Sequence, residues 1–341
     1  MKKIYSGIVI FLLLFFILTN CKDTKYIIIS ETPTPVVNKN WQTVGSAGFS
    51  AGVGYYTSLY VYNGIPYVAY SDGANVNKAT VMKYEGGQWQ TVGVPWFSAD
   101  IVYYTSLYVY DGIPYVAYRD EGNSGKATVM KYEGGVWQTV GSAGFSGGST
   151  AYTSLYIYNG IPYVAYSDFA DTQKATVMKY EGGIWQTVGT AGFSAGRADY
   201  ISLYIYNGIP YVAYSDHANS EKATVMKYEG GVWQTVGNAG FSAGGTTYIS
   251  LYIYNGIPYV AYSDHANSGE TTVMKYEAGI WQTVGSAGFS LVETDNISLY
   301  VYNGIPYVAY SDYTDFYKAT VMKYEGGYGR QWVTQGFQRV E

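Results

Sequence analysis

Short runs of tyrosine, valine, isoleucine and leucine recur along most of the chain, and aliphatic residues alternate with tyrosine within them. In one run, Leu155 and Ile157 alternate with Tyr156 and Tyr158. A period of two is typical of a β-strand, whereas an amphipathic helix repeats every 3.6 residues. Because large apolar side chains face both ways, each sheet needs a covering layer on both sides. We therefore expect every sheet to pack between two neighbours.

The runs belong to one unit that occurs six times. Each copy opens on Trp-Gln-Thr-Val-Gly and continues with Ser-Leu-Tyr-(Val/Ile)-Tyr, Ile-Pro-Tyr-Val-Ala-Tyr and Thr-Val-Met-Lys-Tyr. The copies begin 48 residues apart, at Trp41, Trp89, Trp137, Trp185, Trp233 and Trp281. Repeats of roughly 40–50 residues with four strands each are the signature of a β-propeller. The sequence predicts an all-β, six-bladed β-propeller over 41–341, built of four-stranded antiparallel blades and closed into a ring. An open β-solenoid is the alternative.

Two hairpin turns are strongly specified. The Asn-Gly pair at 159–160 suits a two-residue turn in which both residues need positive φ. The Gly-Gly pair at 182–183 joins the third strand to the tryptophan strand and places Tyr180 opposite Trp185. Blade five carries Ala278 where the other blades have the first glycine of this pair. We expect a looser turn, or another turn type, at that place.

Two segments compete for the last strand of the ring. One copy of the tryptophan strand starts at Trp41, before the first complete blade, and another starts at Trp332, after the last one. The first matches the repeat without change, whereas the second reads Trp-Val-Thr-Gln and arrives 51 residues after Trp281. We expect the N-terminal strand to complete blade six, and the Trp332 strand is the alternative.

The unit resembles β-propeller repeats of uncharacterised bacterial surface proteins, and the resemblance covers residues 41 to about 328. It is also loosely similar to kelch repeats, which likewise place a tyrosine before a tryptophan. Kelch repeats have their glycine pair at the end of an earlier strand, whereas here the pair occupies the last hairpin. The Ser-x-Asp-x-Gly-x-x-Trp box of sialidases is not found in the sequence. The resemblance implies a fold and hardly constrains the function.

The first 40 residues predict export and anchoring. Two lysines precede an apolar run over 8–18, which is shorter than the roughly 20 residues that span a bilayer and is typical of a signal peptide. Cys21 stands directly behind Leu-Thr-Asn, and this resembles a bacterial lipobox, although the asparagine departs from the small residue usual there. The resemblance implies a signal peptide over 1–20 and a diacylglycerol-modified Cys21 at the start of an extended tether over 21–40. An ordinary secretory signal and an uncleaved anchor are the alternatives. We expect the protein to be lipid-anchored to the bacterial cell envelope, on the outer membrane surface or the periplasmic face.

The copies differ from one another in a patterned way. The repeats 137–184 and 185–232 differ at eleven positions, of which ten fall within 142–153 and 169–173 of the first repeat. In an up-and-down sheet, the loop between the second and third strands lies at the same end as the link to the next blade. Variation therefore collects on one rim, the variable rim, and the glycine hairpins form the opposite, uniform rim. Binding residues commonly lie on such loops, although drift of tolerant loops would give the same pattern.

We expect the variable rim to bind the ligand. Aromatic platforms beside hydrogen-bonding groups suit sugar rings or extended peptides. The candidate ligand-binding residues are Trp96, Arg119, Glu121, Phe169, Arg197, His217, His265, Tyr313, Phe316 and Tyr317. Tyrosines of the strands, such as Tyr60, Tyr67 and Tyr84, are expected to pack between blades instead.

One aspartate recurs at the same place in all six blades. The six copies are Asp72, Asp120, Asp168, Asp216, Asp264 and Asp312. Carboxylates alone could hold Ca²⁺ at this rim. The preferred interpretation is that each aspartate accepts backbone N–H groups where its strand turns into the loop. We expect no cofactor.

Composition and charge narrow the functional classes. The chain has 42 glycines and 42 tyrosines, only 13% charged residues and a formal net charge of −5. This composition excludes a disordered chain, and the absence of a basic stripe argues against nucleic acid. A single cysteine and two histidines leave little for a zinc site or general-base catalysis. His217 and His265 lie in matching positions of neighbouring blades, which duplication explains better than a shared metal.

Catalytic motifs are not apparent in the sequence. No Ser/His/Asp nucleophile arrangement is apparent, and six equivalent aspartates differ from the two unlike carboxylates of a glycosidase. We therefore expect a monomeric, non-catalytic protein that binds polysaccharide or an extracellular or envelope protein and meets the membrane only through its lipid. The alternatives are a glycan-active hydrolase on the same ring and a structural or assembly subunit that binds through the uniform rim.

Overall fold

The computed structural model describes residues 44–46, 48–290, 292–312, 318–324 and 333–334. The chain divides into two compact units, Met1–Asn40 and Trp41–Glu341, and the described residues belong to the second. The signal peptide, Cys21 and the tether lie outside the described residues and stay predictions. Within the described part of the chain, no helix has the length and apolar character needed to cross a bilayer.

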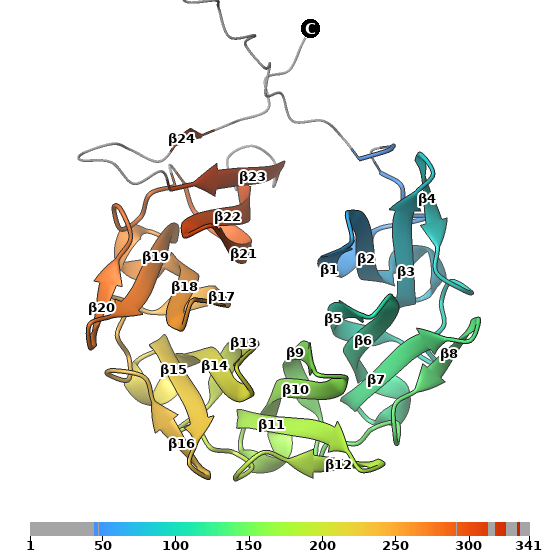
Figure 1. Ribbon diagram of the computed structural model, residues 1–341, viewed down its shortest axis with the longest axis horizontal. Helices are drawn as coiled ribbons and strands as arrows, with labels where there is room; N and C mark the ends of the chain where they lie inside the picture. Colours follow the sequence, from blue (N-terminus) through green and yellow to red (C-terminus); the bar gives the residue numbers. More distant parts are fainter. Residues whose placement is uncertain (1–43, 47, 291, 313–317, 325–332, 335–341) are drawn as a thin grey trace, which may run out of the picture. The chain divides into compact units, whose positions relative to one another are not determined.

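The described residues form six four-stranded antiparallel sheets set around a central channel, which confirms the predicted six-bladed propeller (Figure 1). In each blade the strands follow one another in chain order from the channel outwards. Blades one and two contain β1 (Gly54–Tyr62), β2 (Ile65–Asp72), β3 (Lys78–Glu85), β4 (Gln88–Thr91), β5 (Val102–Tyr110), β6 (Ile113–Asp120), β7 (Lys126–Glu133) and β8 (Val136–Thr139). Blades three and four contain β9 (Thr150–Tyr158), β10 (Ile161–Asp168), β11 (Lys174–Glu181), β12 (Ile184–Thr187), β13 (Ala198–Tyr206), β14 (Ile209–Asp216), β15 (Lys222–Glu229) and β16 (Val232–Thr235). Blades five and six contain β17 (Thr246–Tyr254), β18 (Ile257–Asp264), β19 (Glu270–Glu277), β20 (Ile280–Thr283), β21 (Thr294–Tyr302), β22 (Ile305–Asp312), β23 (Lys318–Lys323) and β24 (Val333–Thr334).

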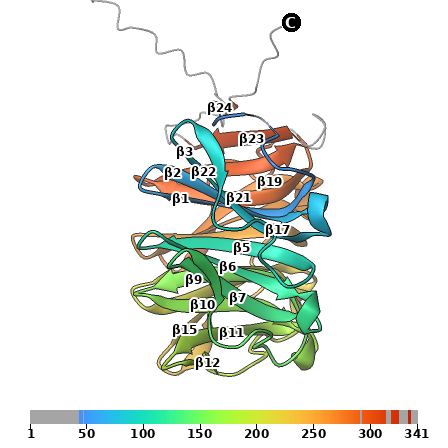
Figure 2. The same ribbon diagram turned by 90° about the vertical axis from the view of Figure 1, so that its right-hand side faces the viewer.

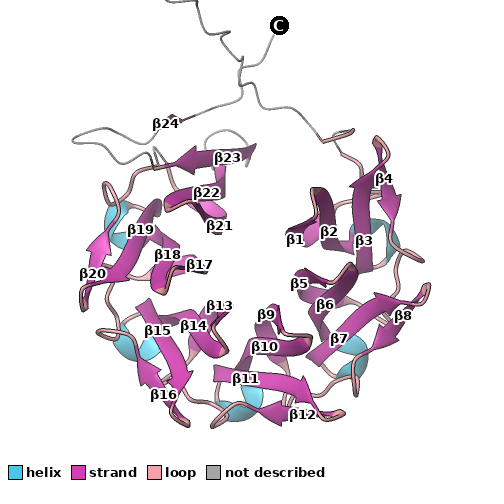
Figure 3. Cartoon of the chain, viewed as in Figure 1, coloured by secondary structure: helices cyan, strands magenta, loops and turns pink. Residues whose placement is uncertain are grey.

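A single 3₁₀ turn follows the second strand in each of the first five blades (Figure 3). These turns are η1 (Gly73–Asn75), η2 (Glu121–Asn123), η3 (Phe169–Asp171), η4 (His217–Asn219) and η5 (His265–Asn267). The first N–H of a turn donates to the link that precedes the same blade, as Phe169 N does to Ser149 O at 3.0 Å. Figure 2, an edge-on view of the ring, shows the turns along one edge. The two variable stretches are therefore joined on one rim, as the alternation of strands predicts.

The glycine hairpins have the predicted geometry. Asn159 and Gly160 adopt φ values of 49° and 78°, and Tyr180 pairs with Trp185 across the last hairpin. The turn of blade five is not the exception that the sequence suggested. Ala278 adopts φ 52°, and the strands around it keep the register of the other blades. A Cβ at the equivalent Gly182 would meet nothing within 4 Å, so a methyl group fits there without steric conflict.

Consecutive blades are joined by contacts between an outer tryptophan and the preceding link. Trp185 Nε1 donates to Val140 O at 2.9 Å, and Phe145 stacks on the indole with ring centroids 3.8 Å apart. Gly141 lies between them with φ 70°, and a Cβ on it would lie 2.5 Å from the ring of Tyr180. Only glycine fits this position, because it accepts the left-handed backbone and leaves room for the ring.

The hydrophobic core consists of a series of similar clusters between blades. In one cluster, Leu155 and Ile157 of β9 pack with Val129 and Tyr115 of the preceding blade. The prediction that strand tyrosines pack between blades is confirmed for Tyr60 and Tyr67, which lie in or against such a cluster. Tyr84 packs on Trp89 of its own blade, with ring centroids 5.5 Å apart, and its copies Tyr132 and Tyr180 also pack against the clusters between blades.

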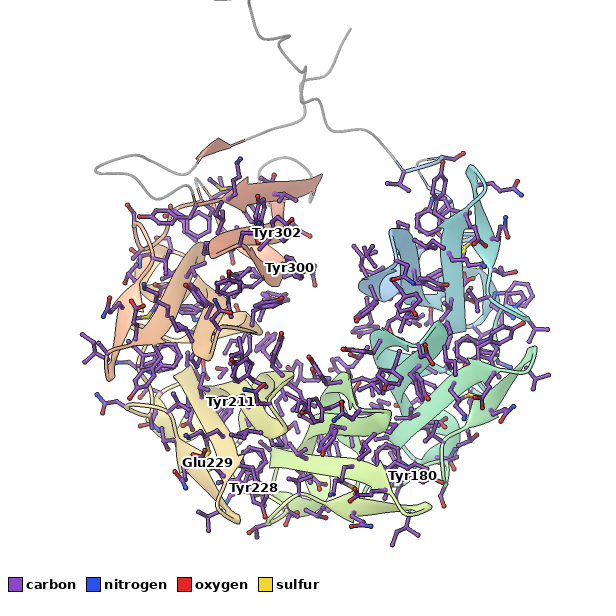
Figure 4. The ribbon with its side chains drawn as sticks, in the orientation of Figure 1. Tyr180, Tyr211, Tyr228, Glu229, Tyr300 and Tyr302 are labelled. Carbon is purple, nitrogen blue, oxygen red and sulfur yellow. The ribbon has the colours of Figure 1, made fainter. Side chains whose placement is uncertain are left out.

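Among the described residues, the ring is not closed between blade six and blade one. Neighbouring inner strands pack together from β1 to β21, but among the described residues β21 and β1 do not pack in this way (Figure 1). Leu59 of β1 is consequently 65% exposed, whereas the equivalent Leu155 is 5% exposed. Tyr300 and Tyr302 of blade six lie beside this opening (Figure 4). The expectation of a closed ring therefore holds at five interfaces, and the described residues do not meet it at the sixth, which we call the seam.

The fourth strand of blade six comes from the C-terminal copy of the repeat. Thr334 pairs with Met322 of β23, as Thr187 pairs with Met178 in blade three. The expectation that the N-terminal copy fills this place is therefore wrong. The C-terminal copy follows β23 closely along the chain, so it pairs with little loss of loop entropy, whereas the N-terminal copy would have to close the ring. Trp41 and Trp332 themselves lie outside the described residues.

Candidate functional site

Each inner strand has a β-bulge near its start, on the variable rim. In β9, Ala151 pairs with Ser167 and Ser154 pairs with Ala165, so Tyr152 and the threonine after it oppose a single residue. Tyr152 adopts φ 54°, in the left-handed region that glycine and asparagine tolerate better than tyrosine. The same conformation recurs at Tyr56, Tyr104, Tyr200, Tyr248 and Asn296. Tyrosine therefore occupies a strained position in five blades, and asparagine relieves the strain only in the sixth.

The bulge residues form a ring around one end of the central channel. The centroid of the Tyr152 aromatic ring lies 5.0 Å from that of Tyr104 and 4.8 Å from that of Tyr200. Together with the residues that follow them, they line a hollow of about 210 Å³ to which all six blades contribute. We call this hollow the channel mouth; it is lined by Tyr56, Thr57, Tyr104, Thr105, Tyr152, Thr153, Tyr200, Ile201, Tyr248, Ile249, Asn296 and Ile297.

The tyrosine hydroxyls of the channel mouth are protonated at neutral pH. Burial raises the pKa of Tyr248 to about 12, and the neighbouring Asp295 carboxylate contributes to the increase. Burial also raises the pKa of Tyr104 and of Tyr200. A neutral phenol both donates and accepts a hydrogen bond. The mouth therefore presents apolar ring surfaces next to hydroxyls, which is the combination that a sugar requires.

A charged cluster from blade four borders the mouth. Asp199 lies directly before Tyr200 in β13, and its Oδ2 is 2.8 Å from Arg197 Nη2 and 2.9 Å from His217 Nε2. The hydrogen bond to Asp199 raises the pKa of Arg197. The structure thus brings together two predicted residues, Arg197 from the link and His217 from η4. The aspartate that joins them was not predicted.

A second hollow, of about 300 Å³, lies beside the mouth between blades one and two. We call it the side hollow; it is lined by Tyr56, Tyr103, Tyr104, Arg119 and Glu121. Arg119 Nε donates to Glu121 Oε1 at 2.6 Å, and the guanidinium carbon lies 5.8 Å from the centre of the Tyr103 ring. Two further predicted residues, Arg119 and Glu121, therefore belong to one concave site.

The other predicted residues do not line either hollow. Trp96 Nε1 donates a hydrogen bond to Asp72 Oδ2 at 3.0 Å, which holds the indole in the link between blades one and two. Phe169 and His265 are exposed first residues of η3 and η5. Tyr313, Phe316 and Tyr317 lie outside the described residues. The variable rim is thus broader than the part of it that is concave.

The recurring aspartates act within their own blades. Asp168 Oδ1 accepts a hydrogen bond from Ala170 N at 3.0 Å, and the same cap occurs at Asp72, Asp216 and Asp264. Asp120 differs, because its Oδ2 accepts from Asn123 and Thr128 while its Oδ1 has no partner. The capping interpretation is confirmed at four of the described positions. Among the described residues, no group of three or more His, Cys, Asp or Glu side chains is placed to hold a metal ion. The side chain of Asp312 is not among those described.

Sequence reasoning missed the tyrosines of the channel mouth. A signal was present, because tyrosine recurs at 56, 104, 152, 200 and 248 inside a stretch whose neighbouring positions change from copy to copy. The bulge that turns these side chains towards the channel was not predicted, since a bulge with left-handed backbone is usually marked by glycine.

Comparison with known proteins shows the fold and no family. No family model matches the chain, and a search of curated proteins found no match, so no lipoprotein or kelch-type family is assigned. Among solved structures, YjhT is similar with a TM-score of 0.56 and 11% identity, over 86% of this chain and 100% of that one. A fungal lectin from Aleuria aurantia, described as a six-bladed β-propeller with a novel fucose recognition mode, has a TM-score of 0.54 and 14% identity over 82% of this chain and 93% of its own. The SapL1 lectin, in complex with α-methyl fucoside, has a TM-score of 0.54 and 14% identity over 84% of this chain and 95% of its own.

Proposed function

We propose that the protein binds carbohydrate through the variable rim and does not convert it chemically. The observation that carries this proposal is the concave site, in which tyrosine rings and hydroxyls meet hydrogen-bonding charged groups on the rim where the repeats differ. Sugars present apolar ring faces edged by hydroxyls, and aromatic side chains with a polar group match both. The presence of lectins among the structures with this fold supports the same class of function.

A glycan array probed with the full chain tests the proposal, and two substitutions on opposite rims sharpen it. Glu121→Gln removes the carboxylate that positions Arg119 in the side hollow, whereas Glu181→Gln removes an equivalent exposed charge on the uniform rim. We expect glycan binding to weaken at least five-fold in the first variant and to stay unchanged in the second. Binding to no glycan on the array would contradict the proposal.

A glycan-active hydrolase is the second candidate function. One observation favours it: burial and the neighbouring Glu293 raise the pKa of Asp295, as happens with the general acid of a glycosidase. The other acidic residues of the site argue against it, because Asp199 and Glu121 are engaged by cations. Turnover of a fluorogenic glycoside panel that disappears in Asp295→Asn would establish hydrolysis. We expect no turnover.

We also propose that the protein is exported and anchored by a lipid on Cys21. The support is the sequence alone, in which the cysteine directly follows the signal-like apolar run. Cells that express the full chain would be labelled with an alkyne analogue of palmitate. Because the chain has one cysteine, Cys21→Ser leaves no other thiol to label, and we expect it to abolish labelling and release the protein from membranes. Labelling that survives in this variant would contradict the anchor.

A further inference from the structure

The channel mouth is a single hollow shared by the six blades, not one site in each blade. A propeller of six similar blades could present one site per blade, but here the bulge residues of all six blades meet around one hollow. Neighbouring rings are about 5 Å apart, with centroid distances of 5.0 Å for Tyr104–Tyr152 and 5.1 Å for Tyr200–Tyr248. The volume of about 210 Å³ is below the roughly 300–1,000 Å³ of pockets for drug-sized ligands. The mouth therefore has room for one ring-sized unit.

The side hollow adjoins the channel mouth on one side, between blades one and two. Tyr56 and Tyr104 line both hollows, so the two hollows adjoin and one extended molecule can reach from the mouth to the side hollow. The side hollow owes its character to Arg119 and Tyr103, which belong to blade two. The place of Arg119 is taken by serine in the other blades, at Ser71, Ser167, Ser215, Ser263 and Ser311. A second unit thus finds a matching surface on one side of the ring.

The charges around the two hollows discriminate between ligands. Arg119 is paired with Glu121 and Arg197 with Asp199, so both guanidinium groups of the site are neutralised. Asp295 lies before the bulge of blade six with Glu293 close by, and it accepts a hydrogen bond from Tyr248. Among the residues that the structure describes, an acidic sugar would find no unpaired arginine at these hollows, and the carboxylates would repel it. A neutral sugar meets hydroxyls and ring faces without this penalty.

We propose that one neutral glycan binds per chain, with its terminal sugar end-on in the channel mouth and its next sugar in the side hollow. This inference rests on the proposed carbohydrate-binding function and adds to it the position, the stoichiometry and the charge class of the ligand.

Calorimetric titration of the full chain tests stoichiometry and charge. The probes are the methyl glycosides of fucose, galactose, glucose, mannose, N-acetylglucosamine and N-acetylgalactosamine, with N-acetylneuraminic acid and glucuronic acid as acidic probes. Disaccharides that carry each neutral sugar at their non-reducing end complete the panel. We expect about one site per chain for a neutral probe and no binding of acidic probes. Five or six sites per chain, or tighter binding of an acidic probe, would overturn the inference and leave the proposed function standing. If none of the probes binds and the glycan array is also negative, the proposed carbohydrate-binding function itself is contradicted, and this inference is contradicted with it.

Substitutions then locate the site. Tyr152→Asn and Tyr200→Asn remove two rings from the mouth but keep a residue that tolerates the left-handed backbone, as Asn296 shows in blade six. We expect the double variant to bind the neutral monosaccharide at least ten-fold more weakly while it keeps a cooperative melting transition. Phe169→Asn is the matched control, because this aromatic side chain is 45% exposed on the same rim and lines neither hollow. Equal weakening by the control, or unchanged binding by the double variant, would overturn the inference.

Arg119→Ala tests whether the second sugar binds in the side hollow. We expect it to lower the affinity for the disaccharide at least five-fold more than the affinity for the corresponding monosaccharide. Equal effects on both probes would contradict the assignment of the second sugar to the side hollow.

Discussion

Single residues with left-handed backbone determine much of this structure, and they do so for different reasons. At Gly141 the backbone conformation favours glycine and the close Tyr180 ring requires it, whereas at Gly182 only the conformation favours glycine. Ala278 adopts the conformation of Gly182 in blade five, which shows that a methyl group is tolerated there. At Tyr152 an aromatic side chain occupies such a conformation at a cost of roughly 1–3 kcal/mol.

The first prediction compares two glycines with similar φ. Gly141→Ala places a Cβ 2.5 Å from the Tyr180 ring, and we expect it to lower the free energy of unfolding by about 3 kcal/mol through strain and overpacking. Gly182→Ala adds a methyl group in open space, and we expect a loss of about 1 kcal/mol. Urea denaturation measures both. Equal losses would show that the close contact with Tyr180 has no energetic consequence.

The second prediction concerns alkaline pH. Burial raises the pKa of Tyr70 from its ordinary 10.0 to about 12, and burial also raises the pKa of Tyr118, Tyr166, Tyr214 and Tyr262. A group whose folded pKa is raised contributes stability that is complete below the unfolded pKa and is lost as pH rises through the folded value. We therefore expect a constant free energy of unfolding between pH 7 and 9 and a steep fall above pH 10, by up to about 1.4 kcal/mol per pH unit for each buried tyrosine. Urea titrations across this range, with tyrosinate absorbance as a second signal, test it; stability that stays flat to pH 12 would contradict it.

At the residue scale, the sequence predicted the roles that depend on local chemistry. The aspartate caps and the Asn-Gly turns follow from hydrogen-bonding capacity and permitted φ, and both were anticipated. The channel mouth was not, because a tyrosine in a strand pattern predicts packing between blades. Only the register shift between Ala151 and Ser154 turns Tyr152 towards the channel.

Among the strands and links, the tryptophan strand acts as a latch that joins its blade to the preceding link. Trp185 holds the preceding link by one hydrogen bond to Val140 and one stack on Phe145. The strand was predictable from its period and its hairpin. Its partner in the neighbouring blade was not, because no local pattern shows which carbonyl an indole will reach.

The third prediction distinguishes the hydrogen bond of Trp185 to Val140 O from its stacking on Phe145. Trp185→Phe keeps an aromatic ring against Phe145 but removes the donor to Val140 O, and we expect a loss of about 1 kcal/mol in the free energy of unfolding. Trp185→Ala removes the stack as well, and we expect about 3 kcal/mol. The same urea denaturation serves for both. A phenylalanine variant as unstable as the alanine variant would assign the whole effect to the hydrogen bond.

The described part of the chain contains six repeats and one seam. The repeat count follows from the spacing of the tryptophans and was predictable. Which terminus completes blade six, and whether blade six packs on blade one, depends on contacts between segments far apart along the chain. The exact repeat at 41–44 favoured the N-terminal strand, but β24 takes the place because it follows β23 directly.

The fourth prediction tests the seam with one substitution at two equivalent positions. Leu155→Ser buries a hydroxyl and leaves a cavity between blades two and three, and we expect it to cost about 3–5 kcal/mol. Leu59→Ser alters a side chain that is 65% exposed at the seam, and we expect a change within about 0.5 kcal/mol. Similar large losses at both positions would show that the ring closes in solution.

On the proposed function, a neutral sugar binds on the variable rim, at the end of the channel that the tyrosine bulges surround. A crystal structure of the chain with the neutral oligosaccharide that binds best on the glycan array measures this most directly. We expect the terminal sugar ring in contact with Tyr104, Tyr152 and Tyr200, with one glycan per chain. A glycan bound on the uniform rim, or repeated between the outer strands of several blades, would contradict the account.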